Sequence, residues 1–142
     1  MKRLKMKTKF SRGDLSRIWL YFMKNNFLKT MRRKVAFSAI GPSALRGQGE
    51  GVSGISQEFL SDLSLKRIPR SSQWRVKAWL DRQTELLLNR YRIKNRPWGA
   101  ARKALNHFLR GALYNQYLNR HFRLRQNEEW LEIPLDSAVA KG

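Results

Sequence analysis

Apolar residues recur three or four positions apart along most of this chain, which is the spacing of one face of an α-helix. The pattern predicts helices from Asp14 onward, over about 28–40, over about 55–64, from Ser71 or Ser72 to before Pro97, from about Gly99 to about 121, and as a final turn from Asp136. No segment alternates apolar and polar residues in the manner of a half-buried strand. We therefore expect an all-α fold built from several helices.

The apolar faces of these helices identify the expected core. The first helix presents a face made by Leu15, Ile18, Trp19, Phe22 and Met23. Trp19, Trp74 and Trp79 all lie on such faces, and we expect most of the tryptophans to be buried. The helix after Gly99 has a buried stripe of Ala101, Leu105, Phe108, Leu109, Ala112 and Leu113. Its opposite stripe is polar and partly cationic, and consists of Lys103, Asn106, His107, Arg110 and Tyr114.

Glycine and proline separate the helical segments. Residues 41–54 are rich in glycine and contain Pro42, which predicts a loop. Pro97 disfavours a helical conformation at Arg96 and so ends the preceding helix. At 142 residues the chain has the length of one domain. We expect a flexible basic arm over 1–12 and a single helical domain over 13–142.

The composition excludes several classes of protein. The absence of cysteine rules out disulfides, thiolate zinc sites and iron–sulfur clusters. His107 and His121 are too few for a convincing metal site, and we expect neither a metal nor a cofactor. No apolar run reaches the length of a membrane span. These features fit a cytoplasmic, nucleoid-associated protein.

The charge of the chain points to a polyanionic partner. Thirty Lys and Arg residues against ten Asp and Glu give a net charge of +20. Such an excess repels itself in the compact state and is typical of proteins that bind nucleic acid. The acids are unevenly placed, since Glu128, Glu129, Glu132 and Asp136 fall within nine positions. This local acidity argues against a purely electrostatic coat protein.

Two short segments near the C-terminus carry candidate chemistry. Pro97-Trp98-Gly99-Ala100-Ala101-Arg102-Lys103-Ala104 predicts a tight turn that leads into a helix. Ile133-Pro134-Leu135-Asp136-Ser137 places a carboxylate at the start of the final helical turn. Two long helices joined near Asn95–Gly99 are typical of a helix-hairpin-helix, whose backbone N–H groups bind a phosphate. A plain pair of antiparallel helices gives the same pattern.

Through these residues the chain resembles the helix-hairpin-helix DNA glycosylase superfamily, which includes endonuclease III, adenine mismatch glycosylases and oxidised-guanine glycosylases. Gly99-Ala100-Ala101-Arg102-Lys103 is similar to the family's glycine hairpin followed by Arg-Lys, with Ala101 in place of the second glycine. Pro134-Leu135-Asp136-Ser137-Ala138-Val139 is similar to the motif that carries the catalytic aspartate. The resemblance covers about residues 35–140. The long connection between the two motifs is similar to that of the archaeal oxidised-guanine branch.

The resemblance implies a base-excision glycosylase that acts on a flipped-out damaged or modified base of duplex DNA. The carboxylate of Asp136 would stabilise the oxocarbenium character that develops when the base–sugar bond breaks. The amine of Lys103 would attack the sugar carbon and form a Schiff base, which adds lyase activity. In the loop over 43–48, Arg46 or Gln48 would fill the gap left by the extruded base. Family members continue with a further helix after Asp136, so the resemblance implies a fragment, a degenerate copy, or a protein partner that completes this region.

Other positions are expected to contact the nucleic acid without taking part in chemistry. They are Trp98, Gly99, Ala101 and Arg102 in the hairpin, His107 and Arg110 on the polar stripe, and the run Arg32-Arg33-Lys34. Plainer interpretations of the same residues stay open. Asp136 can be an N-cap, Lys103 a phosphate contact, and Arg46 and Gln48 ordinary loop residues.

Three further functions remain in competition with the glycosylase. A non-catalytic nucleic-acid-binding module would bind tightly and with strong salt dependence. A basic accessory subunit of a nucleoprotein assembly would bind RNA or an acidic protein, and its arm would order on binding. A helix over about 15–34 lying on anionic lipid is the fourth alternative.

Overall fold

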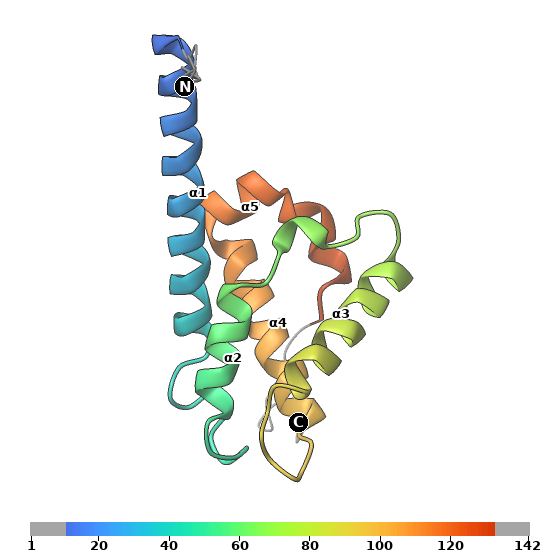
Figure 1. The fold of residues 1–142 in the computed structure, drawn as a ribbon. Helices are drawn as coiled ribbons and strands as arrows, with labels where there is room; N and C mark the ends of the chain where they lie inside the picture. The colour runs from blue at the N-terminus through green and yellow to red at the C-terminus, as the bar shows by residue number, and fades with distance from the viewer. Residues whose placement is uncertain (1–10, 133–142) are drawn as a thin grey trace, which may run out of the picture.

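A computed structural model describes residues 11–132 of the chain, and every regular element in this range is a helix (Figure 1). The elements are α1 (Arg12–Ala39), α2 (Val52–Ser61), the short 3-10 helix η1 (Leu65–Arg67), α3 (Gln73–Leu88), α4 (Trp98–Tyr114), α5 (Gln116–Phe122) and the 3-10 helix η2 (Leu124–Trp130). The predicted all-α fold is confirmed. The final turn expected at Asp136 and most of the basic arm lie outside the described residues.

α4 is the central helix of the bundle. It packs against α1, α2, α3 and α5, and ten of its 17 residues are buried. The predicted buried stripe is confirmed, since Ala101, Leu105, Phe108, Leu109, Ala112 and Leu113 all belong to the core. Figure 1 shows α1 and α3 on different sides of α4. The core therefore forms around α4.

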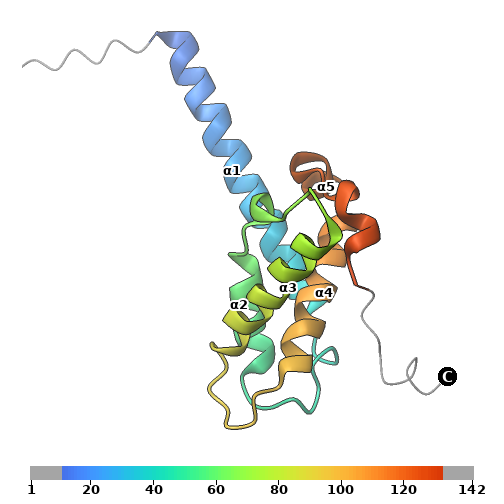
Figure 2. The same cartoon turned by 90° about the vertical axis from the view of Figure 1, so that its right-hand side faces the viewer.

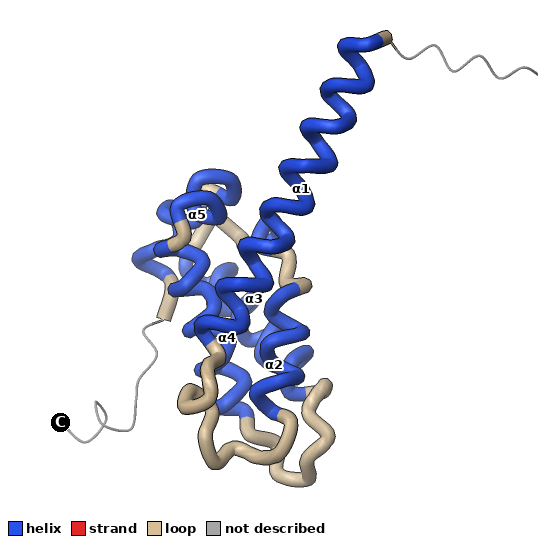
Figure 3. Tube along the Cα trace, turned by 90° about the vertical axis from the view of Figure 1, so that its left-hand side faces the viewer, coloured by secondary structure: helices blue, strands red, loops and turns tan. Residues whose placement is uncertain are grey.

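α1 is one continuous helix where two segments were expected. Its N-cap is Ser11, and the pair Ser11–Asp14 forms a capping box in which each side chain accepts a hydrogen bond from the other residue's backbone N–H. Neither proline nor glycine interrupts the chain from Asp14 to Ala39, so nothing ends the helix between them. The first half of α1 extends past the other helices (Figures 1 and 3).

The predicted burial of two tryptophans is wrong. Trp19 is 65% exposed because the first turns of α1 extend past the other helices, and Trp74 is 67% exposed in the first turn of α3 (Figure 1). The whole predicted apolar face of α1 is likewise exposed. Trp79 does pack against the core. Helical spacing identifies an apolar face but not whether another element covers it.

α3 ends at Leu88, earlier than the expected end just before Pro97 (Figure 2). Nine residues, 89–97, lie between α3 and α4. Tyr91 lies outside the helix and turns into the core, where its hydroxyl lies 2.7 Å from Ser56 Oγ of α2. Arg96 donates hydrogen bonds to Asn89 and Glu85, which fold the connection back on the end of α3. The structure therefore has a nine-residue connection in place of the tight turn expected around Asn95–Gly99.

The predicted helix over about 99–121 is divided by Asn115. This residue ends α4, and its side-chain Oδ1 accepts hydrogen bonds from the N–H groups of Tyr117 and Leu118 at the start of α5. Asparagine is a favourable N-cap because its side chain satisfies N–H groups that have no partner within the helix. The chain therefore turns a corner at Asn115.

Candidate nucleic-acid interface

One stripe of α4 keeps its polar side chains at the surface. Lys103, His107, Arg110 and Tyr114 follow one another at helical spacing, so they lie on one face, which we name the α4 stripe. Lys103 and His107 are half-buried, and Arg110 and Tyr114 are exposed. The guanidinium of Arg110 lies over the ring of Tyr114, 5.9 Å from its centroid. Asn106 was expected on this stripe, but it is buried and donates a hydrogen bond to Glu132.

A groove beside the α4 stripe brings together candidates from distant parts of the sequence. It has a volume of about 510 Å³ and is lined by Lys34, Ser38 and Ala39 of α1 and by His107 and Arg110 of α4, among others. We name it the α1–α4 groove. Of the predicted contacts, Lys34, His107 and Arg110 therefore line one surface, on which a chain of phosphates can lie between two cations.

Close packing of the two helices sets the depth of this groove. A Cβ atom placed on Gly111 would lie 2.9 Å from Val35 Cγ1. Only a residue without a side chain therefore lets α1 approach α4 so closely at this point. Lys34 directly precedes Val35 and Arg110 directly precedes Gly111, so this contact also fixes where the two cations stand.

Arg102 does not have the predicted role of a phosphate contact. It is only 7% exposed, and all three of its guanidinium nitrogens donate hydrogen bonds within the chain. Nε and Nη2 bind the two oxygens of Glu132 at 2.7 and 2.6 Å, and Nη1 binds Asp81 at 2.9 Å. Thr84 accepts a further bond from Nη1. This network uses four of the five N–H donors of Arg102 within residues 11–132.

The ion pairs of Arg102 also shift the acidity of both partners. The hydrogen bond with Glu132 is the main cause that raises the pKa of Arg102 above its ordinary value, against the opposing effect of burial. Hydrogen bonds from Arg102 are likewise the main cause that lowers the pKa of Glu132 to about 2. Both groups are therefore charged at neutral pH, and the interaction is a bidentate ion pair.

The other hairpin candidates divide between surface and core. Ala101 is completely buried, which contradicts its predicted contact with nucleic acid. Trp98 and Gly99 are exposed in the first turn of α4. The guanidinium of Arg102 lies 5.4 Å from the centroid of the Trp98 ring, so this ring partly covers the ion pair.

The run Arg32-Arg33-Lys34 does not act as one face. Arg32 is half-buried and donates a hydrogen bond to the carbonyl of Leu63, which joins α1 to the end of α2. Arg33 and Lys34 are exposed, and Arg33 lies over the ring of Phe37 at 4.7 Å. Only Lys34 of the three lines the α1–α4 groove.

Arg46 and Gln48 are exposed in the loop between α1 and α2. This loop meets the connection between α3 and α4, because the side chain of Ile93 approaches the backbone of Gly49. The figures place both loops at the end of the bundle where α4 begins (Figures 1 and 3). Sequence reasoning missed the exposed cations Arg92 and Lys94 at this end, although the run from Arg90 to Arg96 alternates basic residues with others.

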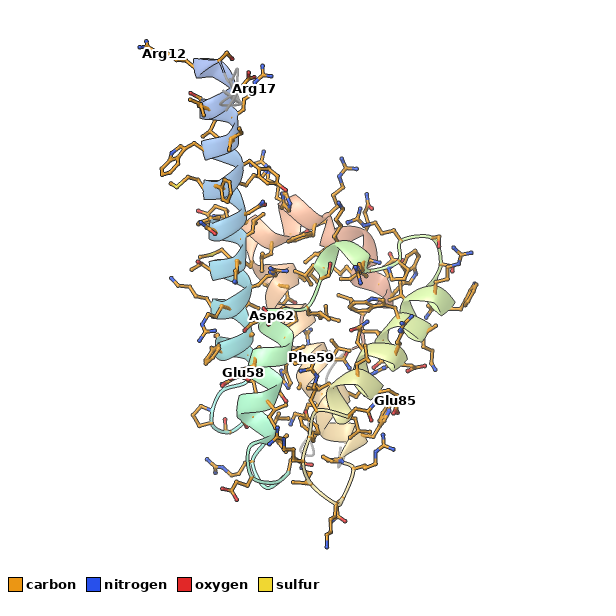
Figure 4. All side chains as sticks on the ribbon, in the orientation of Figure 1. Arg12, Arg17, Glu58, Phe59, Asp62 and Glu85 are labelled. Carbon is orange, nitrogen blue, oxygen red and sulfur yellow. The ribbon has the colours of Figure 1, made fainter. Side chains whose placement is uncertain are left out.

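A larger groove lies between α2 and α3, with a volume of about 630 Å³. It is lined by the acidic residues Glu58 and Asp62, which Figure 4 labels on and just after α2, and by the basic residues Arg67, Arg82 and Arg90. The two carboxylates would repel a phosphate, whereas no acidic residue among 11–132 lines the α1–α4 groove. Size alone therefore does not make the α2–α3 groove the better nucleic-acid interface.

The structure describes only one of the two predicted catalytic residues. Lys103 lies half-buried on α4, and Asp136 lies outside the described residues. Glu132, four residues before Asp136, is bound to Arg102, which directly precedes Lys103.

Comparison with protein families, with curated proteins and with solved structures finds no match to the chain. The resemblance to the DNA glycosylases therefore rests on the quoted motifs alone.

Proposed function

We propose that this chain is a nucleic-acid-binding module that holds the sugar–phosphate backbone of duplex DNA on the α4 stripe and the α1–α4 groove. The observation that carries the proposal is the meeting of Lys34, His107 and Arg110 in one groove of a chain with a net charge of +20. Among residues 11–132 every lysine and arginine is exposed except Arg32 and Lys103, which are half-buried, and Arg102.

The burial of α4 favours backbone contacts over the reading of base edges. A recognition helix must present a broad exposed face to the floor of the major groove. α4 has neighbours on several sides and offers only a stripe beside α1. Its 17 residues span about 25 Å, the length of about seven base pairs. We therefore expect affinity with little sequence preference and with strong salt dependence.

Fluorescence anisotropy with a labelled duplex tests this proposal. The double variant Lys34→Gln/Arg110→Gln should bind the duplex at least about tenfold more weakly than the wild type at moderate salt. The slope of log affinity against log salt should fall by about two, one for each lost phosphate contact. A single-stranded RNA competitor of equal length measures the preference between nucleic acids.

The matched control removes the same charges elsewhere. Arg75→Gln/Lys77→Gln changes one arginine and one lysine that are exposed on α3. This pair should weaken binding by less than about threefold, because it alters only the long-range field. An equal loss of DNA affinity in both double variants would mean that binding depends on the total charge and not on one surface. That result would contradict the proposal.

A base-excision glycosylase is the second proposal, supported by the attachment of Glu132 beside Lys103 and by the two motifs. Borohydride should then trap a covalent adduct with a duplex that contains a damaged base, and Lys103→Gln should abolish the adduct. Asp136→Asn should lower base release strongly without an equal loss of binding. Absence of base release from a broad panel of lesions, with binding intact, leaves the non-catalytic module.

A further inference from the structure

The first half of α1 exposes an unusual set of large apolar side chains. Exposed residues there include Leu15, Trp19, Phe22 and Met23, and Trp19 and Phe22 are 65% and 61% exposed. This half of the helix stands clear of the other helices in every view, with Arg12 and Arg17 near its free end (Figures 3 and 4). Large exposed apolar patches are uncommon on soluble proteins and mark surfaces that bind a partner.

The direction of this apolar stripe follows from helical geometry. Leu28, Val35 and Ala36 are the buried residues with which α1 packs on the bundle. At about 100° per residue, Trp19 projects from roughly the side opposite to their mean direction, and Leu15 and Phe22 lie between that side and the flank that carries Ala36. The stripe therefore faces away from the bundle, and a flat surface can meet it without touching α2–α5.

The basic residues in the first half of α1 can contact the headgroups of an anionic surface. Arg17 and Lys24 project from the side away from the stripe, which also carries the exposed Leu20 and Tyr21, and Arg12 lies near the end of α1. Tryptophan, phenylalanine and leucine on one face with basic residues on the other are typical of helices that lie in a membrane interface. Long basic side chains reach back to headgroups while the apolar face enters the acyl region.

No helix among residues 11–132 has the length and apolar character needed to cross a bilayer. We propose that the first half of α1 binds the surface of an anionic lipid bilayer, with Leu15, Trp19 and Phe22 inserted at the headgroup boundary. Charge decides against a second copy of the chain as the occupant. Pairing two copies along this stripe brings two chains of +20 together, whereas an anionic bilayer neutralises that charge.

Flotation of the full, nucleic-acid-free chain with vesicles tests the proposal. The chain should float with vesicles of phosphatidylcholine and phosphatidylglycerol and stay behind with phosphatidylcholine alone. Trp19→Gln/Phe22→Gln should lower the bound fraction at least about tenfold, because the two largest inserted groups are gone. The control Tyr21→Gln removes an aromatic side chain that is 67% exposed on the other side of the helix, and it should change binding by less than about twofold.

Quenching of tryptophan fluorescence by lipids brominated on their acyl chains gives a second measurement. Quenching should occur in the wild type and be largely lost in Trp19→Gln, while circular dichroism shows unchanged helix content. Binding that is equal in Trp19→Gln/Phe22→Gln and the wild type would overturn the proposal. Two other results would also overturn it. One is a wild-type dimer that becomes monomeric in this double variant, and the other is a loss of affinity for duplex DNA as large as the loss of vesicle binding. Each of them would mean that the stripe binds a different partner.

Discussion

Arg102 binds two carboxylates from distant parts of the chain, Asp81 in α3 and Glu132 after η2. A buried guanidinium without such partners would be strongly destabilising. Arg102 was expected to contact nucleic acid because it lies in the hairpin motif at the start of a helix. Asp81 and Glu132 are too far away along the chain for local reasoning to pair them with Arg102.

Removal of this guanidinium should destabilise the fold. Arg102→Ala should lower the free energy of unfolding by about 3 kcal/mol, because it breaks a largely buried network of ion pairs. Arg75→Ala removes an exposed arginine and should change it by less than about 0.5 kcal/mol. Urea unfolding followed by circular dichroism measures both. A similar small effect of both substitutions would show that the network adds no stability.

The lowered pKa of Glu132 predicts a pH dependence with a definite sign. Because the folded value of about 2 lies below the ordinary 4.5, the Arg102–Glu132 pair stabilises the fold fully above about pH 4.5. This contribution is lost as the pH falls from there toward 2. The stability gap between the wild type and Glu132→Gln should therefore shrink between pH 5 and about pH 2.5. Urea midpoints at several pH values test this, and a constant gap would contradict it.

At the scale of elements, helical periodicity located the helices and the buried stripe of α4. It did not locate where they end. α3 stops at Leu88 because Tyr91 meets Ser56 in the core, a contact between residues far apart in sequence. Apolar spacing also cannot tell a face that packs on the bundle from one that is left open, which is why Trp19 was expected in the core.

The contact between Gly111 and Val35 predicts the effect of a single methyl group. Alanine is the better helix former, but its Cβ would meet Val35 Cγ1, so Gly111→Ala should lower the free energy of unfolding by about 1–2 kcal/mol. The loss should shrink when Val35→Ala is also present. A double-mutant cycle from urea unfolding measures this coupling.

Gly99 of the same helix is the matched control. A Cβ atom there would meet nothing within 4 Å, and the backbone is helical. Gly99→Ala should be neutral or stabilise the fold by up to about 1 kcal/mol. Equal effects at the two glycines would mean that the α1–α4 contact tolerates a side chain.

For the whole molecule, the sequence predicts the excess of positive charge but not its arrangement in space. The prediction of a polyanionic partner rests on this excess, and nearly all of the described lysines and arginines are exposed. The composition did not reveal which of them share a surface. Lys34 and Arg110 line one groove only because α1 crosses α4 at Gly111.

The same excess of charge predicts how salt affects the folded state. Repulsion among cations weakens the compact form and is screened at higher ionic strength. The free energy of unfolding should therefore rise when sodium chloride is increased from low to moderate concentration. Urea midpoints at the two salt concentrations measure the change. A fall with salt would show that attractive ion pairs outweigh the repulsion.

The ion pair between Arg102 and Glu132 also affects the design of shortened versions of this protein. Cutting the chain after Leu131 would leave every helix among residues 11–132 intact, because η2 ends at Trp130. Such a cut would take away the acid that neutralises an interior cation on the central helix. A fragment meant to keep the bundle intact should therefore retain Glu132, even if every later residue is dropped.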